Sequence, residues 1–279
     1  MSSMTLTLRA AQEGRLDLSG VVPDRLLPLS LSEIAAMTIS VDGRAYPLAE
    51  IFEIEDGTRD KLILSGDLVR ADNVGGNMRD GMLLVEGSVG HCLAQNMRGG
   101  HIVIQRDAGD YVSSGQRGGY VNIEGSVQNY CAASLPGERR GMRGGVLRVA
   151  GTAGRFLGHR MRRGTVVVLG DVGQGCASSL VAGTIVCCGT IAPPLGVSMR
   201  RGTVVCLSTT APPLHVGFTV PEQIRLSYLH LLFDALRPQL PDVQVDTVGR
   251  QPMWRSLGDR ASAGTGEILW LAAEPSMAE

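Results

Sequence analysis

The chain has 279 residues, a formal net charge of −1 and an aromatic content of 4%. This length is sufficient for a large buried core. The near-neutral charge argues against a protein built to bind nucleic acid or an acidic membrane surface. No run of 18 apolar residues occurs, and residues 1–5 lack a charged-then-apolar leader, so we expect neither a membrane span nor a signal peptide.

The cysteines indicate the cellular compartment of the protein, and the basic residues indicate the kind of organism that encodes it. The six cysteines form no Cys-x-x-Cys pair, which favours the reducing cytoplasm over a disulfide-stabilised secreted protein. Lys61 is the only lysine, so arginine supplies the other basic side chains. Such a bias is typical of a GC-rich genome and favours a bacterium.

Residues 1–58 lack the sequence repeat that is found in the central part of the chain. Short apolar runs predict strands at 5–9, 16–19, 39–41 and 51–54, and residues 31–37 predict a short helix begun by a serine. A stacked structure needs a cover at its end, because a bare end would leave strand edges unpaired. We therefore expect residues 1–58 to form a small α+β cap, with the stack beginning at residue 59 and its first strand near residues 62–66.

The central part of the chain repeats one short phrase, as in Met161-Arg-Arg-Gly164. The glycines that close these phrases lie 19, 19, 26, 19, 19 and 19 residues apart. They are Gly81, Gly100, Gly119, Gly145, Gly164, Gly183 and Gly202. A constant step indicates one structural unit that stacks on itself, because no single unit buries its own apolar side.

A short apolar run rich in β-branched residues follows each glycine and predicts a strand. Two positions after the glycine, the predicted inward-facing residues are Leu83, Ile102, Val121, Leu147, Val166, Ile185 and Val204. Four positions after it they are Val85, Ile104, Ile123, Val149, Val168, Cys187 and Cys206. Strands and glycine turns in a 19-residue period predict an all-β fold over residues 59–215, a single-stranded right-handed parallel β-helix.

The 26-residue step contains an insertion of seven residues within 129–140. An insertion between two intact repeats projects from one flank of a solenoid, and such loops often border a binding face. We therefore expect a loop here rather than an interruption of the stack.

The outward-facing positions of the later coils are apolar, so something must cover them. The predicted interface residues are Val167, Leu169, Val186, Val205 and Leu207. Residues 221–236 predict a helix with Ile224, Tyr228, Leu231, Leu232 and Leu236 on one stripe. This helix is one candidate cover, and a partner subunit is the other. Within the C-terminal region, 216–279, we expect an irregular tail from about residue 241 that docks on a neighbour.

The sequence offers no catalytic constellation. The five histidines are scattered without His-x-His or His-x-x-x-His spacing, and neither a Gly-x-Ser-x-Gly elbow nor a phosphate-binding loop ending in Gly-Lys-Ser/Thr occurs. The glycines are explained by the repeat turns. We therefore expect no catalytic residue, no metal site and no cofactor bound by this chain's own chemistry.

One repeated residue type stands out at the position two before each key glycine. Arginine occupies it in six coils, and Val181 replaces it in one. The arginines are Arg79, Arg98, Arg117, Arg143, Arg162 and Arg200. Stacked strands lie about 4.8 Å apart, so these side chains form a vertical ladder. Each arginine either bonds a turn carbonyl or neighbouring acid, or the ladder serves as a track for a polyanion or an acidic partner surface.

The repeated phrase Met-Arg-x-Gly-x-[VI]-x-[VI]-x-Gly-x-x-Gly, over roughly residues 60–210, resembles the GXGXG β-helix family. This family includes the C-terminal domain of the glutamate synthase large subunit. It also includes the subunits designated C, or C-type subunits, of formylmethanofuran dehydrogenase and of the formyltransferase/hydrolase complex. Because the β-helix is nearly the whole chain here, the resemblance favours a stand-alone C-type subunit. The arginine bias favours the bacterial formyltransferase/hydrolase complex over the archaeal molybdenum or tungsten dehydrogenase.

The resemblance implies a non-catalytic, cytoplasmic scaffold subunit in a hetero-oligomer. Its implied partners are an amidohydrolase-like subunit that releases formate and a formyltransferase subunit. Formyl groups would move between tetrahydromethanopterin-type and methanofuran- or methylofuran-type carriers at the level of the complex. Because the family's furan carrier has a polyglutamate tail, Arg79, Arg98, Arg117 and Arg143 are the candidate contacts for that tail or for an acidic partner.

Two alternatives remain from other classes of protein. One is an independent β-helix enzyme that acts on polysaccharide, which lyase or hydrolase activity of the purified chain would favour. The other is a glutamate-synthase-type β-helix protein that works with a flavin partner, which a neighbouring amidotransferase gene would favour.

Overall fold

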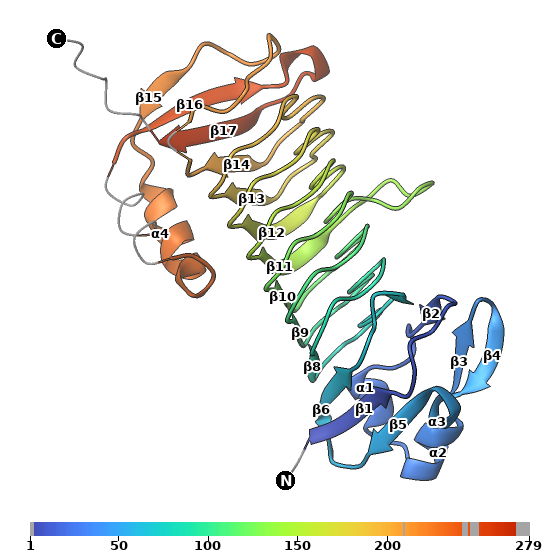
Figure 1. Cartoon of the computed structure of the whole chain (residues 1–279). Coiled ribbons are helices and arrows are strands. Elements are labelled where there is room, and N and C mark those ends of the chain that lie inside the picture. Colours follow the sequence, from blue (N-terminus) through green and yellow to red (C-terminus); the bar gives the residue numbers. More distant parts are fainter. Residues whose placement is uncertain (1–2, 209, 242–244, 246–250, 272–279) are drawn as a thin grey trace.

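The fold is dominated by β-structure arranged as a long stack (Figure 1). The computed structural model describes residues 3–208, 210–241, 245 and 251–271. In this part of the chain a 13-stranded mixed sheet runs in the order β15-β16-β17-β14-β13-β12-β11-β10-β9-β8-β6-β1-β5, and a second sheet has the order β4-β3-β2-β7. No helix among the described residues is long and apolar enough to cross a membrane.

The N-terminal elements lie at one end of the stack, drawn blue in Figure 1. The helix predicted at 31–37 is present one residue shorter, and its Ser30 and Glu33 form a capping box. In chain order the elements are β1 (Ser3–Leu8), β2 (Leu16–Asp17), α1 (Pro23–Leu26), α2 (Leu31–Ala36), β3 (Thr38–Val41), β4 (Arg44–Pro47), α3 (Leu48–Ile51) and β5 (Phe52–Glu55). The sequence did not predict α1, β4 or α3.

Strand β1 joins the N-terminal elements to the stack. It pairs in parallel with β6 (Thr58–Ser65) and antiparallel with β5, so two further strands extend the main sheet beyond the first coil. The short β7 (Ala71–Asp72) pairs in parallel with β2 in the second sheet. The free edge of β6 is thereby covered, which is the physical role expected of a cap. The boundary at residue 58 stays a prediction.

The repeats form parallel strands in the predicted register. Leu83 pairs with Ile102, Ile102 pairs with Val121, and the series continues through every later repeat. The strands are β8 (Met82–Val85), β9 (His101–Ile104), β10 (Tyr120–Ile123), β11 (Arg143–Val149), β12 (Arg163–Val168), β13 (Thr184–Cys187) and β14 (Thr203–Cys206). The expectation that Val85, Ile104 and Ile123 lie above one another is confirmed.

A second column of contacts forms where each coil turns back. Isolated parallel bridges join Val89 to Ala108, Ala108 to Val127 and Val127 to Ala153, and they continue to Ile191. Each bridge joins equivalent positions of two successive repeats, including the pair on either side of the insertion. The insertion therefore leaves both columns in register, because the extra residues project as the long green loop in Figure 1.

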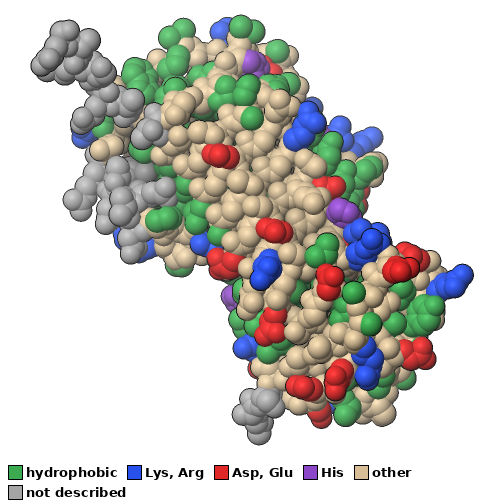
Figure 2. Space-filling view, in the orientation of Figure 1, with side chains coloured by type: hydrophobic (Ala, Val, Ile, Leu, Met, Phe, Trp, Pro, Cys, Tyr) green, Lys and Arg blue, Asp and Glu red, His purple; other side chains and the backbone are tan. Residues whose placement is uncertain are grey.

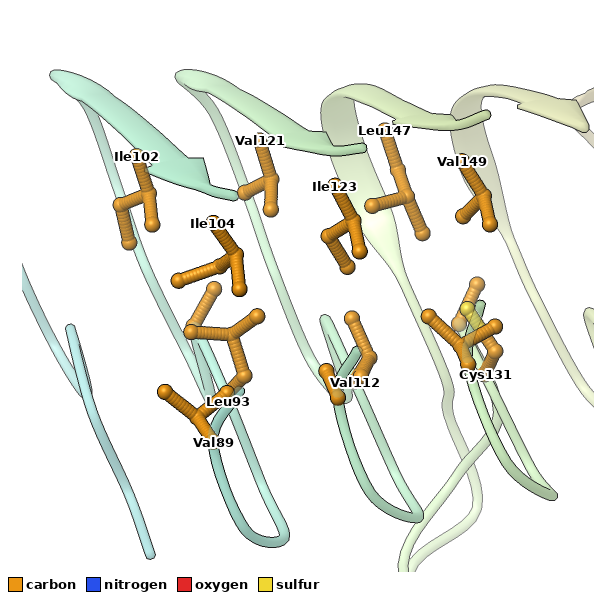
Figure 3. Close-up of a cluster of buried hydrophobic side chains, with 14 of the residues drawn as sticks. Val89, Leu93, Ile102, Ile104, Val112, Val121, Ile123, Cys131, Leu147 and Val149 are labelled. Atoms are coloured by element: carbon orange, nitrogen blue, oxygen red, sulfur yellow. The ribbon is translucent and has the colours of Figure 1, made fainter. Parts of the chain in front are cut away.

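The core lies between these columns. Each side chain of the two predicted inward ladders is at most 2% exposed. Figure 3 shows Ile102, Ile104, Val121 and Ile123 pointing from the strands toward Val112 and neighbouring side chains on the opposite wall. Adjacent coils therefore share one continuous apolar interior, and no coil has a separate core of its own.

The C-terminal region departs from the prediction in two places. Residues 222–224 form a strand rather than the start of a helix, and the predicted irregular tail contains two long strands. The elements are β15 (Glu222–Ile224), α4 (Ser227–Leu236), a 3₁₀ turn (Arg237–Gln239), β16 (Met253–Gly258), a second 3₁₀ turn (Arg260–Ser262) and β17 (Gly266–Leu271). Strand β17 pairs in parallel with β14, so it forms the next rung of the stack. Whether the tail also docks on a neighbouring protein stays a prediction.

Helix α4 packs beside the later coils, and its buried stripe matches the predicted one only in part, since Leu236 is buried and Leu232 is partly buried as predicted. Leu229, Phe233 and Leu236 face a second apolar cluster that includes Val167 and Val186. Leu231, which the sequence placed on the buried stripe, is 72% exposed, and Tyr228 is 41% exposed. The helix begins at Ser227, six residues later than predicted, because residues 222–224 form strand β15.

This packing predicts a clear contrast between two leucines of the same helix. Leu229→Ala is expected to lower the free energy of unfolding by about 2–5 kcal/mol, because Leu229 is 3% exposed and its loss leaves a cavity. Leu231→Ala is expected to change it by less than about 0.5 kcal/mol, as for other surface substitutions. Urea denaturation of both variants measures the difference. Equal destabilisation would show that α4 packs differently.

Candidate functional site

The arginines form a ladder along one edge of the stack. The backbone N–H of Arg98 donates to the Met78 carbonyl at 2.8 Å, and that of Arg117 donates to the Met97 carbonyl at 2.7 Å. Each arginine is thus tied by its backbone to the coil before it. The methionines that precede them are Met78, Met97, Met142, Met161 and Met199, and all are 0% exposed. Because neighbouring residues face opposite ways, the arginines are directed outward.

The four arginines proposed from sequence as ligand contacts differ in exposure. Arg79, Arg98 and Arg117 are exposed, whereas Arg143 is half-buried. Partial burial lowers the pKa of Arg143, and the positive charges of Arg117, Arg140 and Arg162 lower it further. Like charges at neighbouring positions of the stack repel one another. The ladder is therefore a concentrated strip of positive charge.

The ladder arginines form no ion pair among the described residues, although the negative charge of Glu138 acts on Arg143 and opposes the lowering of its pKa. Among the described residues, none of the ion pairs involves Arg79, Arg98, Arg117 or Arg143. The Nε atom of Arg143 is buried without a hydrogen-bond partner. The first sequence interpretation has each arginine bonded to a turn carbonyl or a neighbouring acid, and no such ion pair is formed by these four side chains among the described residues. The choice between the two interpretations stays a prediction. The guanidinium groups remain available to an anion from outside the described chain.

A groove of about 780 Å³ continues this edge at the later coils. Arg139 of the insertion loop lines it together with Arg160 and Arg200. The sequence analysis identified Arg200 as part of the ladder but missed Arg139 and Arg160. The path of the insertion loop brings Arg139 over the next coils, and no repeat pattern encodes that path. Figure 2 shows Lys and Arg side chains gathered on the side of the stack from which this loop projects.

Most of the interface residues predicted from sequence are buried within the chain. Val167, Val186 and Val205 are 0% exposed and Leu207 is 6% exposed, while Leu169 packs partly buried against the same cluster. Helix α4 packs over these side chains and leaves Leu169 partly exposed, so contact of this cluster with a partner stays a prediction. The intramolecular cover considered from the sequence is the one observed. A partner on this side would meet the outer surface of α4.

The repeated glycines act through backbone geometry. All seven key glycines have positive φ, between +78° and +110°. At Gly119, a Cβ atom would lie 2.7 Å from the Gly100 carbonyl oxygen of the preceding coil. The glycines therefore permit both the left-handed turn and the close stacking of coils, and they form no ligand site of their own.

The side chains that most often hold metal ions are histidine, cysteine, aspartate and glutamate, and cysteine can also carry out redox chemistry. Among the described residues, no group of three His, Cys, Asp or Glu side chains is arranged to hold a metal ion. All six cysteines are unpaired by disulfides. Burial raises the pKa of the Cys131, Cys176 and Cys206 thiols well above its ordinary value, so these groups are kept protonated and unreactive.

Comparison with known proteins identifies the family. No family model matches the chain. An alignment of 89 residues, 32% of this chain, is 36% identical to the C-type subunit of the formyltransferase/hydrolase complex Fhc of Methylorubrum extorquens, and it spans only 34% of that relative's length. A chain in the crystal structure of the formyltransferase/hydrolase complex (FhcABCD) from Methylorubrum extorquens, in complex with methylofuran, superposes with a TM-score of 0.88. That match is 32% identical and covers 96% of this chain and 99% of the solved one.

The chain belongs to the family of C-type subunits of formyltransferase/hydrolase complexes. The family resemblance inferred from the repeats is thereby confirmed. The positively charged edge and the adjoining groove lie on the surface of the chain and take no part in packing its core. The stack arranges both along one side, where they are accessible.

Proposed function

We propose that this chain is a non-catalytic scaffold subunit of a formyltransferase/hydrolase complex. The complex would move formyl groups between tetrahydromethanopterin-type and methanofuran-type carriers and release formate. The observation that carries the proposal is the match over 99% of the length of a chain solved within such a complex. A shared fold at 32% identity over 96% of this chain supports a shared place in the assembly.

We further propose that the fold is a right-handed, single-stranded parallel β-helix of the all-β class. Each coil of this β-helix corresponds to one sequence repeat. The parallel pairing of equivalent residues one coil apart supports it. We propose that the chain has three domains: a cap at 1–58, the β-helix at 59–215, and a helix with a docking tail at 216–279. A long, stiff rod of this kind suits a subunit that holds enzymes at fixed positions.

The proposed partners are an amidohydrolase-like subunit and a formyltransferase subunit of the same cytoplasmic complex. Arg79, Arg98, Arg117 and Arg143 are proposed to contact either an acidic partner surface or the polyglutamate tail of a furan-type carrier. The absence of ion pairs to these side chains among the described residues supports this role. Arginine suits it because its planar guanidinium pairs with a carboxylate through two hydrogen bonds.

Purification of the tagged chain from its native cells tests the proposal. We expect it to recover an amidohydrolase and a formyltransferase in a constant ratio, with formyl-transfer activity in the complex and none in the isolated chain. In the same preparation, Arg98→Val/Arg117→Val is expected to weaken binding of the carrier or partner about tenfold or more, since charge-assisted hydrogen bonds contribute about 1.5–3 kcal/mol.

Valine is chosen because Val181 occupies the equivalent position in a native coil, so folding should be retained. The matched control is Arg44→Ala, on the exposed β4 strand at the N-terminal end. Recovery of the chain alone, or activity in the chain alone, would contradict the scaffold function. Full assembly with unchanged carrier and partner affinity would contradict only the role of the arginines.

A further inference from the structure

The basic groove lies at the one coil in which the arginine ladder is interrupted. Val181 lines its floor, where the neighbouring coils have Arg162 and Arg200. The walls come from separate parts of the chain. They contribute the polar side chains of Arg139, Arg160, Ser179, Ser198, Arg200 and Ser262. The groove is therefore assembled by the tertiary fold and is not a repeat of the ladder.

Three of these residues occupy the same corner of successive coils. Arg160, Ser179 and Ser198 are each one repeat apart and have φ of +56°, +53° and +59°. The Arg160 N–H donates to the Ser178 carbonyl at 3.2 Å, and the Ser179 N–H donates to the Val197 carbonyl at 2.7 Å. Since stacked strands lie about 4.8 Å apart, the groove spans about 10 Å along the stack over these three corners.

Two segments distant in sequence close the groove. The insertion loop contributes Arg139, and Arg160 Nη1 donates to the backbone carbonyl of Glu138 in that loop at 3.3 Å. On the other side, Ser262 belongs to the 3₁₀ turn between β16 and β17. This turn is held against the corners because the buried Asp259 carboxylate accepts hydrogen bonds from the N–H groups of Ser198 and Ala261, each at 3.0 Å.

The lining has three guanidinium groups and no carboxylate. Among the described residues, Arg139, Arg160 and Arg200 take part in no ion pair. The nearest buried acid, Asp259, is already occupied by backbone donors and is 3% exposed. Three like charges around one concave surface are unfavourable without anions between them. The serine hydroxyls add further hydrogen-bond donors at the same surface.

We propose that this groove binds an acidic peptide segment of a partner protein in an extended conformation. Alternate side chains of an extended segment lie on one face about 6.7 Å apart, so two carboxylates fit the length of the groove. Arg160 and Arg200 pair with successive carboxylates, and Arg139 closes over them from the loop. Val181 provides an apolar floor for the methylene groups of glutamate side chains. The inference rests on the proposed function, because it names the kind of partner segment that the basic side of this subunit would bind.

Binding of a fluorescein-labelled hexaglutamate peptide tests the site by fluorescence anisotropy. The purified full chain carries Arg98→Val/Arg117→Val throughout, so that these two proposed ladder contacts do not bind the same peptide. Arg160→Asn/Arg200→Val is expected to weaken binding about 100-fold, because each charge-assisted contact contributes on the order of tenfold. Both replacements occur naturally at equivalent positions, as Asn96 and Val181, and asparagine tolerates the left-handed backbone. Arg139→Ala is expected to weaken binding about tenfold, and raising the salt concentration should weaken binding by the native groove further.

Three controls decide the outcome. Arg44→Ala removes one exposed arginine far from the groove and is expected to leave the affinity within twofold of the value for the Arg98→Val/Arg117→Val chain. A labelled hexaserine peptide is expected not to bind. Free glutamate and inorganic phosphate are expected to compete only at concentrations far above that of the peptide. Undiminished binding in the folded chain with Arg160→Asn/Arg200→Val, or free glutamate or phosphate that competes as well as the peptide, would overturn the proposal.

Discussion

Gly100→Ala is expected to lower the free energy of unfolding by about 2–5 kcal/mol. Gly100 has φ of +81°, and the left-handed backbone costs an L-residue about 1–2 kcal/mol. The added Cβ would also lie 2.7 Å from the Gly81 carbonyl oxygen and 2.7 Å from Met78 Cε. The Gly81 carbonyl accepts a hydrogen bond from the His101 N–H at 2.9 Å, so it cannot move without breaking this bond between successive coils. Overpacking of this kind costs about 1–3 kcal/mol more.

Gly43→Ala separates the two contributions. Gly43 has nearly the same φ, +79°, but nothing lies within 4 Å of its added Cβ. Its expected cost is therefore the backbone strain alone, about 1–2 kcal/mol. Chemical denaturation of both variants gives the difference. If the two substitutions cost the same, the close stacking of coils at the glycine position would not contribute to stability.

Ile102→Asp is expected to prevent the chain from folding. Ile102 is 0% exposed and pairs with Leu83 on one side and Val121 on the other, in the continuous interior shown in Figure 3. An unpaired buried carboxylate costs several kcal/mol, and the methyl groups lost add about 2–5 kcal/mol. Together these approach the whole stability of a typical domain, about 5–15 kcal/mol. Soluble yield and circular dichroism measure the outcome.

His101→Asp places a carboxylate one residue away on the exposed face of the same strand. It is expected to fold, with a loss of less than about 1 kcal/mol. The conservative Ile102→Val is expected to cost about 0.5–1.5 kcal/mol and to fold. A soluble, native-like Ile102→Asp protein would mean that position 102 does not face the core.

The register of the stack could be predicted because the sequence contains two regular patterns, the repeat of the coils and the alternation of side chains within each strand. The constant step between repeats brings equivalent residues together, and the alternation of side chains within a strand separates inside from outside. Ile102 and Val121 are therefore placed in contact by counting alone. The arginine edge follows from the same counting, since it lies on a fixed position of every coil.

Strand β17 could not be found by counting, although a faint pattern exists. Gly266 is followed by Glu-Ile-Leu-Trp-Leu, which resembles Gly202 followed by Thr-Val-Val-Cys-Leu, but the segment between the two glycines is far longer than one repeat. A chain excursion of that length obscures the period, so the sequence predicted an irregular tail. Pairing with β14 became favourable because the last repeated coil offers an unpaired strand edge and the end of an apolar core.

The orientation of α4 also depended on the rest of the molecule. A stripe of apolar residues indicates that a helix has a face that packs against the core. Leu229 and Leu231 are both leucines, so only their surroundings in the folded chain distinguish the buried one from the exposed one. In the folded chain Leu229 packs in the cluster with Val167 and Val186, whereas Leu231 is exposed. The same holds for the groove, because its lining comes from a loop, coil corners and a turn.

The amino-acid sequence alone determined the repeat, its inward ladders, the glycine turns and the family resemblance, because these depend on interactions between residues at a constant separation. Only the tertiary structure decided what covers the later coils, what closes the C-terminal end, and which arginines meet in one groove. Those features join segments whose separation follows no period, so their partners are selected by the free surface that the stack leaves exposed.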